Sequence, residues 1–485
     1  ERLHTAGTVH NVEWYAAGET VQSDGWREND GYRLDSALGR INVSLAHRQS
    51  LAFLVQYEGG REDDPGSLTA FELAANPRQS PFNLYDFTRG RHRLASLTYS
   101  WKPANGWSVS AQGYLRRQDR DTLTTGRFLS GFLARDREHL NGMILQAAKS
   151  GKSGPWSWTL SGAVEGNGGK LKARGFYTDF TGGNAVPATD TATTESGEGA
   201  YLNLDLGRGK SRFAVGFRRD RHRYTYEDHF NPIGGSQRVF LDNTLRLGYL
   251  YKTSRWSSAF VNYSEAYRIP SVVQLFAYPG FYSNPDLVPT RAYDWEAGWR
   301  YLKGAWRFSV DAFRMDMRNE VVFVLTQPQF FIGQSENVGR SYRKGVEFTA
   351  HMPLVKGLSA FLQGSYMDSV MTAGPNAGSR VPMVPRYQGA GGLQWLVRGL
   401  EIRLEGVTVG PERLDNDLAN VQPGIPGYTV VNLSARWQYH ALTLQASADN
   451  LLDRSYVSRG ITNGATNYYT PAYPRSYRVS VMWSF

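Results

Sequence analysis

One alternating segment of the sequence, residues 212–224, carries cationic and ring side chains on both of its faces. Successive side chains of a β-strand point to opposite sides, so Phe213, Val215 and Phe217 share a face with the arginines that follow them. Arginines beyond an apolar stripe could pair bidentately with phosphate groups, or they could only keep the surface soluble. This face carries Arg219, Arg221 and Arg223, and the opposite face carries Arg218, Asp220, His222 and Tyr224.

A second set of cationic and aromatic residues lies on a further alternating segment and in the longer polar stretches. Arg116 follows Tyr114 and Gln112 on one face, and Arg459 lies near the end of the chain. Guanidinium and aromatic groups around one opening would suit a large anionic ligand that is partly planar. The alternative is that they only hold connecting segments to one another. The candidate ligand-binding residues are therefore Arg116, Arg218, His222, Tyr224, Tyr278, Phe281, Tyr282, Arg459, Tyr468, Tyr469 and Tyr473.

Signatures of catalysis and of metal binding are missing from the sequence. The absence of cysteine excludes disulfides, thiolate metal ligands and cysteine nucleophiles. The nine histidines show no helical three- or four-residue spacing, and no Gly-x-Ser-x-Gly motif occurs. The sequence Gly209-Lys210-Ser211 is not preceded by the glycine-rich segment that a phosphate-binding loop requires. We expect no enzyme, no bound metal and no cofactor.

The candidate residues are set between stretches that alternate apolar and polar side chains, which predicts β-strands. The last stretch, Ser476–Phe485, places Tyr477, Val479, Val481 and Trp483 on one face and mostly polar residues on the other. A strand with one apolar and one polar side is typical of a membrane barrel, with lipid outside and a polar lumen. No run of about 18 apolar residues occurs, so no transmembrane helix is predicted.

The predicted strands are joined alternately by short and long connections, as in outer-membrane barrels. Residues 5–17 are predicted to form one strand and residues 58–92 a long polar insert, and about twenty strands are readable in all. A soluble propeller is the alternative, but the fixed repeat that it requires is missing. Short connections are predicted near 103–106, 150–154, 207–210, 252–255, 303–304, 356–357, 398–399 and 440–441, and long ones near 120–138, 165–196, 225–242, 266–290, 318–340, 368–385, 408–426 and 449–474.

Composition agrees with a barrel and with an anionic partner. The 485 residues have a formal net charge of +10, and 13% of them are aromatic. The mean hydropathy of −0.46 is that of a soluble protein, as expected where half of each strand faces water. No basic helical face is present, so we expect no nucleic-acid partner.

Five segments resemble, in order and in spacing, the barrel of the TonB-dependent receptors. Residues 24–68 are also similar to the early barrel of that family. Thr290 stands where the family usually has glutamate. The five segments are Ser264–Ser271 with Leu275 and Phe276, Asn284–Thr290 with Trp295–Gly298, Asn337–Glu347, Asp449–Tyr456 and Pro474–Phe485.

The resemblance implies an all-β fold, a transmembrane antiparallel β-barrel of the 22-stranded type. Residues 1–485 would form this barrel domain. We expect the N-terminal plug domain of the family, and the first one or two strands, to lie outside this sequence.

The resemblance also implies an outer-membrane receptor that binds a large, scarce ligand at extracellular loops and imports it with energy from TonB. The expected ligand is a ferric siderophore or a ferric carboxylate complex. Arg219, Arg221 and Arg223 would contact lipopolysaccharide. The expected partners are therefore TonB, a ferric chelate and the lipid and lipopolysaccharide of the outer membrane.

Three alternatives remain open at this point. The imported cargo could instead be cobalamin, haem, a quinone cofactor or an oligosaccharide. The chain could form a passive porin without a plug. An enzyme on a barrel scaffold is the third, against which the missing catalytic signatures argue.

Overall fold

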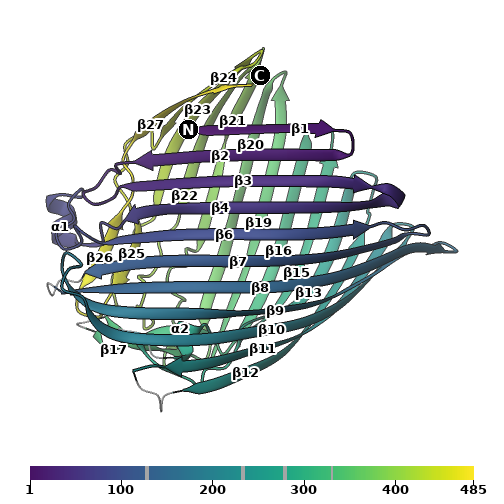
Figure 1. The fold of residues 1–485 in the computed structure, drawn as a ribbon. Coiled ribbons are helices and arrows are strands. Elements are labelled where there is room, and N and C mark those ends of the chain that lie inside the picture. Colours follow the sequence, from purple (N-terminus) through teal and green to yellow (C-terminus); the bar gives the residue numbers. More distant parts are fainter. Residues whose placement is uncertain (126–129, 231–234, 277–280, 329–330, 485) are drawn as a thin grey trace.

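The computed structural model describes residues 1–125, 130–230, 235–276, 281–328 and 331–484. Its main element is a 21-stranded sheet that curves around a central space, here called the lumen (Figure 1). Every neighbouring pair of strands in this sheet is antiparallel. The strands are β1 (Arg2–Val9), β2 (Val12–Ser23), β3 (Tyr32–Leu45), β4 (Gln49–Asp63), β6 (Phe87–Trp101), β7 (Trp107–Thr125), β8 (Ser130–Ser153), β9 (Trp156–Asp179), β10 (Val186–Arg208), β11 (Ser211–Asp228), β12 (Ser236–Tyr251), β13 (Ser257–Arg268), β15 (Thr290–Lys303), β16 (Trp306–Arg318), β19 (Arg340–Val355), β20 (Leu358–Met371), β21 (Tyr387–Val397), β22 (Leu400–Val409), β23 (Tyr428–Tyr439), β24 (Leu442–Asp449) and β27 (Ser476–Trp483).

The remaining elements are short and lie in connections. The 3-10 turn η1 (Ala46–Arg48) joins β3 to β4. None of the helices within the described ranges is long and apolar enough to cross a membrane. The others are β5 (Leu68–Thr69), α1 (Ala70–Ala75), α2 (Val272–Leu275), β14 (Phe281–Tyr282), β17 (Val321–Gln327), β18 (Ile332–Asn337), β25 (Val457–Thr462) and β26 (Asn467–Pro471), all of which lie at one end of the sheet, here called the long-loop end (Figure 1).

The two faces of the sheet differ as the alternation predicts. Exposed apolar side chains point away from the lumen, as in Leu115, Phe217 and Val479, which are 64%, 51% and 76% exposed. Their sequence neighbours point into the lumen and are mostly polar. This arrangement is that of a membrane barrel, in which lipid covers the outer face.

Two predicted boundaries near the N-terminus are wrong. Residues 5–17 form two strands, β1 and β2, joined by a hairpin at His10 and Asn11. The predicted insert 58–92 is shorter, because β4 continues to Asp63 and β6 begins at Phe87. Polar residues on both faces hide the alternation in these strand ends, while backbone hydrogen bonding continues.

Three predicted long connections are also wrong. The structure extends β7 to Thr125, β9 to Asp179 and β11 to Asp228, so the connections near 120–138, 165–196 and 225–242 are largely strand. The strands β8 and β9 reach 24 residues each, whereas β24 has 8. The wall formed by β7–β11 is therefore much taller than the wall formed by β22–β24.

The edge strands β1 and β27 have no backbone pairing with each other in the part of the chain that the structure describes. Both strands run toward the short-turn end of the sheet, because β1 enters the turn at His10 and β27 follows the connection after β24. A direct pairing of these two edges would be parallel, unlike every other neighbouring pair in the sheet.

Candidate ligand-binding site

Arg116 and Arg218 lie on the lumen face of the tall wall, and both bind carboxylates. Arg116 on β7 donates to Glu138 on β8, with 2.7 Å between Nη2 and Oε1. Arg218 on β11 donates through Nε and Nη2 to Asp220, at 2.7 and 2.6 Å, and also binds Glu165 on β9. The positive charges of Arg116 and Arg218 are therefore balanced by carboxylates of the protein.

Arg218 lines one of the hollows in the lumen wall. This hollow has a volume of about 410 Å³, and its polar lining includes Asn203, Arg246, Asn262 and Glu296. Two lumenal arginines and one glutamate thus face the same space. The hollow could hold polar groups of a solute that has entered the lumen.

His222 and Tyr224, on the same face of β11, lie nearer the long-loop end. Nε2 of His222 is 3.4 Å from the hydroxyl of Tyr267. Tyr224 is only 9% exposed, and it packs edge-on against Phe240. It belongs to a buried apolar cluster that also contains Tyr226, Leu275, Phe276, Leu287 and Val321. This cluster fixes α2 and its connection to the wall.

The predicted loop residues contact other loops. Tyr282 accepts a hydrogen bond from the amide of Gln327 at 2.8 Å, and the backbone of Phe281–Tyr282 pairs with β18. The guanidinium of Arg459 lies 2.6 Å from a carboxylate oxygen of Asp415. These contacts join separate connections at the mouth of the lumen.

Tyr468 and Tyr469 lie in a second small sheet at the same end. Their strand β26 pairs with Leu68 and Thr69 of β5, although these segments lie about 400 residues apart along the chain. The ring of Tyr468 is 5.6 Å from that of Phe331, which follows β17. The predicted Tyr278 lies outside the described residues.

A pocket that the sequence did not reveal is lined by three arginines. Arg380 and Arg386, between β20 and β21, meet Arg413, between β22 and β23, around a cavity of about 400 Å³. Glu412 also lines this pocket, and burial raises the pKa of its carboxyl. Three guanidinium groups and one carboxyl with a raised pKa make the pocket electropositive, which favours an anionic ligand.

The backbone around this arginine pocket is held by its own hydrogen bonds. The amide of Arg380 donates to Oδ1 of Asn420 at 2.7 Å, and Asn420 Nδ2 donates back to the carbonyl of Arg380 at 3.0 Å. Arg413 donates to the carbonyl of Gln422 at 3.1 Å. Nη2 of Arg380 is buried and has no hydrogen-bond partner among the described residues. A buried donor without a partner is costly, so an acceptor from a ligand would be stabilised there.

The arginine pocket could not be found from sequence spacing. Arg380 and Arg413 fall in two separate connections, and Arg386 lies at the end of one of them. The sequence signal was weak: each connection carries an arginine one or two residues after a proline, as in Pro385-Arg386 and Pro411-Glu412-Arg413. An arginine near a proline does not indicate any particular kind of site.

Arg219, Arg221 and Arg223 lie on the outer face, on the opposite side of the wall from Arg218. All three side chains are exposed. Arg221 is 3.8 Å from Glu198 of β10. These arginines therefore cannot contribute to a site in the lumen.

A metal site would need several histidine or carboxylate side chains close together. Within the described ranges, no three histidine, aspartate or glutamate side chains come together in an arrangement that could hold a metal ion.

Comparison with protein families matches residues 25–451 to the family described as TonB dependent receptor-like, beta-barrel. Among curated proteins, the pesticin receptors of Yersinia enterocolitica and Yersinia pestis are 25% identical to the chain over 277 and 275 residues. The aligned part is 54% of this chain and 39% of each receptor. The chain thus spans less than half the length of these relatives.

Solved structures of receptors and transporters share the fold. The ferric citrate transporter FecA, in its unliganded form, superposes with a TM-score of 0.88 at 19% identity, covering 99% of this chain and 75% of that one. The ferric yersiniabactin uptake receptor FyuA from Yersinia pestis gives 0.81 at 17%, covering 100% and 77%. The copper transporter OprC gives 0.83 at 15%, covering 100% and 77%. At these identities the likeness concerns the fold alone.

Proposed function

The chain belongs to the TonB-dependent receptor family, and on that premise we propose that it takes part in the import of an anionic ferric chelate, either a siderophore or a carboxylate complex. The barrels of this family lie in the bacterial outer membrane. The long-loop end of the sheet is then the extracellular end, where the ligand arrives. Energy from TonB would drive the import step, as is general in the family.

The arginine pocket is the observation that supports an anionic ligand. Ferric complexes of carboxylates and of catecholates carry net negative charge, which guanidinium groups bind through charge-assisted hydrogen bonds. Arg380 offers a buried Nη2 donor that has no partner among the described residues, and Arg386 is exposed at the same pocket. The lumenal Arg116 and Arg218 and the loop residues Arg459, Tyr468 and Tyr469 would contact the ligand only after it leaves this pocket or displaces their present partners.

Uptake measurements on cells that express the full-length protein test this function. The double variant Arg380→Gln with Arg386→Gln removes two cations but no side-chain hydrogen bond of the described residues, so we expect the loops to keep their structure. We expect its half-saturating concentration for a ferric citrate complex to rise at least about tenfold, because each lost charge-assisted bond is worth that order. Arg255→Gln, at the short-turn end, is the matched control and should leave uptake unchanged.

The choice of cargo and the need for energy are tested in the same cells. A panel of ferric citrate, a ferric catecholate, a ferric hydroxamate, haem and cobalamin separates the possible ligands by charge. Uptake of none of the ferric chelates would contradict the proposal, and uptake of haem or cobalamin alone would replace it. Import that persists without TonB, together with a steady open conductance in planar bilayers, would indicate a passive pore.

A further inference from the structure

The three guanidinium groups of the arginine pocket differ in how far the protein itself satisfies them. Arg413 donates to the carbonyls of Asn420 and Gln422, at 3.4 and 3.1 Å. Nη2 of Arg380 is buried and has no partner among the described residues. Arg386 forms no ion pair with a carboxylate of the described residues. The pocket therefore offers free hydrogen-bond donors on two of its arginines.

The carboxyl of Glu412 lines the same cavity and is also free. Its side chain has neither a hydrogen bond nor an ion pair with any described residue. The backbone of Glu412 is held in place, since its amide and its carbonyl pair with those of Ile425 at 3.1 and 2.8 Å. Burial disfavours the charged carboxylate and raises the pKa of Glu412. A half-buried carboxyl of this kind is stabilised by a hydrogen bond with a ligand.

The free groups of the pocket require different atoms from a ligand. Negative oxygens suit Arg380 and Arg386, because guanidinium groups donate several hydrogen bonds and accept none. A bare oxyanion does not suit an ionised Glu412, because two like charges in contact repel each other. An ammonium group would suit Glu412, but it would lie among three guanidinium charges. The ligand that meets both requirements is an acid that carries a hydroxyl or an acidic hydrogen beside its negative oxygens.

We propose that Glu412 is a specificity-determining residue of the arginine pocket, which admits a carboxylate ligand that shares one hydrogen with the Glu412 carboxyl. Hydroxycarboxylates and partly protonated carboxylates bring this hydrogen with them. A tris-catecholate complex does not, because its charged oxygens are bound to iron and carry no hydrogen. A ligand without such a hydrogen binds well only when Glu412 itself takes up a proton. This assignment rests on the proposed function and narrows the two chelate classes named there to carboxylates.

The lumenal hollow beside Arg218 also combines arginines and carboxyls, but its acids already have partners. Glu296 accepts a hydrogen bond from the side-chain amide of Asn262 at 3.3 Å. Glu265 accepts one from the hydroxyl of Tyr263 at 2.7 Å. Neither carboxyl needs a hydrogen from a ligand, so this hollow lacks the selective feature of the arginine pocket.

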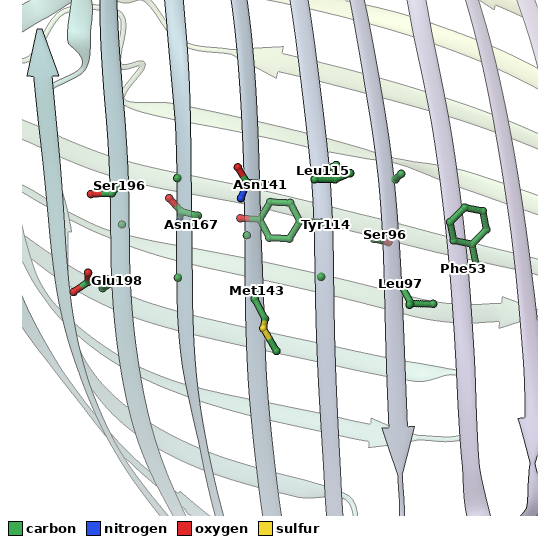
Figure 2. A pocket seen from close by; sticks show the side chains of 16 residues that line it. Phe53, Ser96, Leu97, Tyr114, Leu115, Asn141, Met143, Asn167, Ser196 and Glu198 are labelled. Carbon is green, nitrogen blue, oxygen red and sulfur yellow. The ribbon is translucent and has the colours of Figure 1, made fainter.

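A larger hollow, in the wall formed by β4 and β6–β10, has a carboxyl but lacks the cations (Figure 2). Its volume is about 650 Å³, and its polar side chains include Tyr114, Asn167 and Glu198. Arginine and lysine are absent from the described residues that line it. It therefore offers no charged donor to an acid, and the combination of free guanidinium groups with a free carboxyl distinguishes the arginine pocket from both hollows.

Glu412→Gln tests the selection by this carboxyl in cells that express the full-length protein. Glutamine keeps the size of the side chain, removes its charge and adds an N–H donor for a bare oxyanion. We expect the half-saturating concentration for uptake of a ferric tris-catecholate to fall at least about tenfold, and that for ferric citrate to change less than about threefold. The ratio of the two concentrations is the readout, because a structural defect would alter both in the same direction.

The matched control is Glu13→Gln, which makes the same chemical change at the short-turn end of β2. The side chain of Glu13 is exposed and forms no ion pair with a described residue. We expect this variant to keep the ratio of the unaltered protein. An equal ratio in the two variants would overturn the selective role of Glu412.

Sulfate binding to the purified full-length protein tests the shared hydrogen without any ferric chelate. Sulfate carries no proton between pH 8 and pH 5.5, so the proton between it and Glu412 must be taken up from solution. The other titratable or charged groups that line the pocket or interact with Glu412 do not change their charge in this range. They are Arg380, Arg386, Arg413 and Tyr428.

We expect sulfate to bind at least about tenfold more tightly at pH 5.5 than at pH 8, because a bound anion and a proton on Glu412 favour each other. Calorimetric titration measures this, after subtraction of the sulfate that the double variant Arg380→Gln with Arg386→Gln still binds. Glu412→Gln should bind sulfate equally at both pH values. A pH dependence that persists in Glu412→Gln would overturn the shared hydrogen. Uptake is not involved, so a failure of the proposed function and a failure of this assignment are distinguishable.

Discussion

Arg218 of β11 binds Asp220 on its own strand and Glu165 on β9. These contacts cross β10, which carries a glycine at that point. Gly199 of β10 lies beneath the ion pairs, where an added Cβ would be 2.6 Å from Oδ1 of Asp220, 2.9 Å from Nη2 of Arg218 and 3.0 Å from Oε1 of Glu165. Real Cβ atoms essentially never lie that close to other atoms, so any side chain here must displace the network. The glycine thus allows an ion pair to bridge β9 and β11.

The change Gly199→Val tests this bridge. Valine suits a strand, so the backbone should persist while Arg218 moves away from Glu165 and Asp220. Asp220, which is 2% exposed, would lose its cation. We expect the free energy of unfolding to fall by about 1–3 kcal/mol, the cost of a buried polar group without its partner.

The matched control for this change is Gly90→Val, on the lumen face of β6. A Cβ on Gly90 meets no heavy atom within 4 Å, so the control adds the same side chain to open space. Urea unfolding followed by tryptophan fluorescence measures both variants. Equal midpoints for the two would contradict the bridging role of Gly199.

Asp86 is a second residue whose environment makes a prediction. It precedes β6 at the long-loop end and is 2% exposed. Its Oδ1 accepts hydrogen bonds from the amide and the hydroxyl of Thr125, at 2.7 and 2.5 Å, and Oδ2 accepts one from Asn83 at 2.6 Å. Burial raises the pKa of this carboxyl, and the hydrogen bonds from Thr125 and Asn83 oppose that shift only in part.

The raised pKa of Asp86 predicts how the stability of this region depends on pH. The folded state binds the proton more readily than the unfolded state, so stability should rise as the pH falls through the folded pKa toward the ordinary aspartate value. Below that value no further gain is expected. Hydrogen exchange of the amides near Asn83 and Thr125, measured from pH 7 to pH 4, reports this contribution. Asp86→Asn should remove the pH-dependent part, and an unchanged pH profile in that variant would contradict the assignment.

At the scale of elements, the connection that contains α2 is held to the wall by aromatic packing. Phe276 stacks on Tyr226 of β11 with 4.4 Å between ring centroids and 10° between planes. Leu275 and Phe276 are 0% and 4% exposed, although both belong to a connection and not to a strand. The motif Leu275-Phe276 therefore packs a loop against the wall.

Phe276→Ala should loosen this connection without unfolding the sheet. Truncation of a buried phenylalanine costs about 3–5 kcal/mol, which exceeds what the remaining contacts of a short loop can supply. We expect limited proteolysis to cut between β13 and β15 at least tenfold faster, since about 1.4 kcal/mol already corresponds to a factor of ten. Val273→Ala changes an exposed neighbour and is the control. Equal cleavage of the two variants would show that the stack does not hold the loop.

The strands could be predicted from the sequence, and the connections could not. Alternation placed Arg218 and Arg219 on opposite faces, as the structure shows, because a strand has a strict period of two. The ends of β7 and β9 were missed because charged residues on both faces, such as Arg120 and Asp121, remove the apolar signal while the backbone pairing continues. Arg380 and Arg413 meet through loop packing, for which no sequence period exists.

Tyr224 illustrates both what could and what could not be predicted from the sequence. Its face was predicted correctly, but its neighbours were not, because Phe240 is on another strand and Phe276 is in a loop. Periodicity specifies the direction of a side chain, and tertiary packing determines whether that side chain is free to meet a ligand.

At the scale of the whole molecule, positive charge is divided between two surfaces. The arginine pocket lies among the loops, and Arg219, Arg221 and Arg223 lie on the outer face of β11, on the opposite side of the wall from the lumen. The net charge of +10 is therefore not gathered on one face of the molecule.

The unequal length of the strands has a consequence for how the rim of the long-loop end is built. At about 3.3 Å per residue, β8 is about 80 Å long and β24 about 26 Å. The short strands β22–β24 are followed by the long connections 410–427 and 450–475, the second of which contains β25 and β26. The rim is therefore built of strand on the side of β7–β11 and of loop on the side of β22–β24, so backbone amides at the rim should exchange with solvent more slowly on the first side.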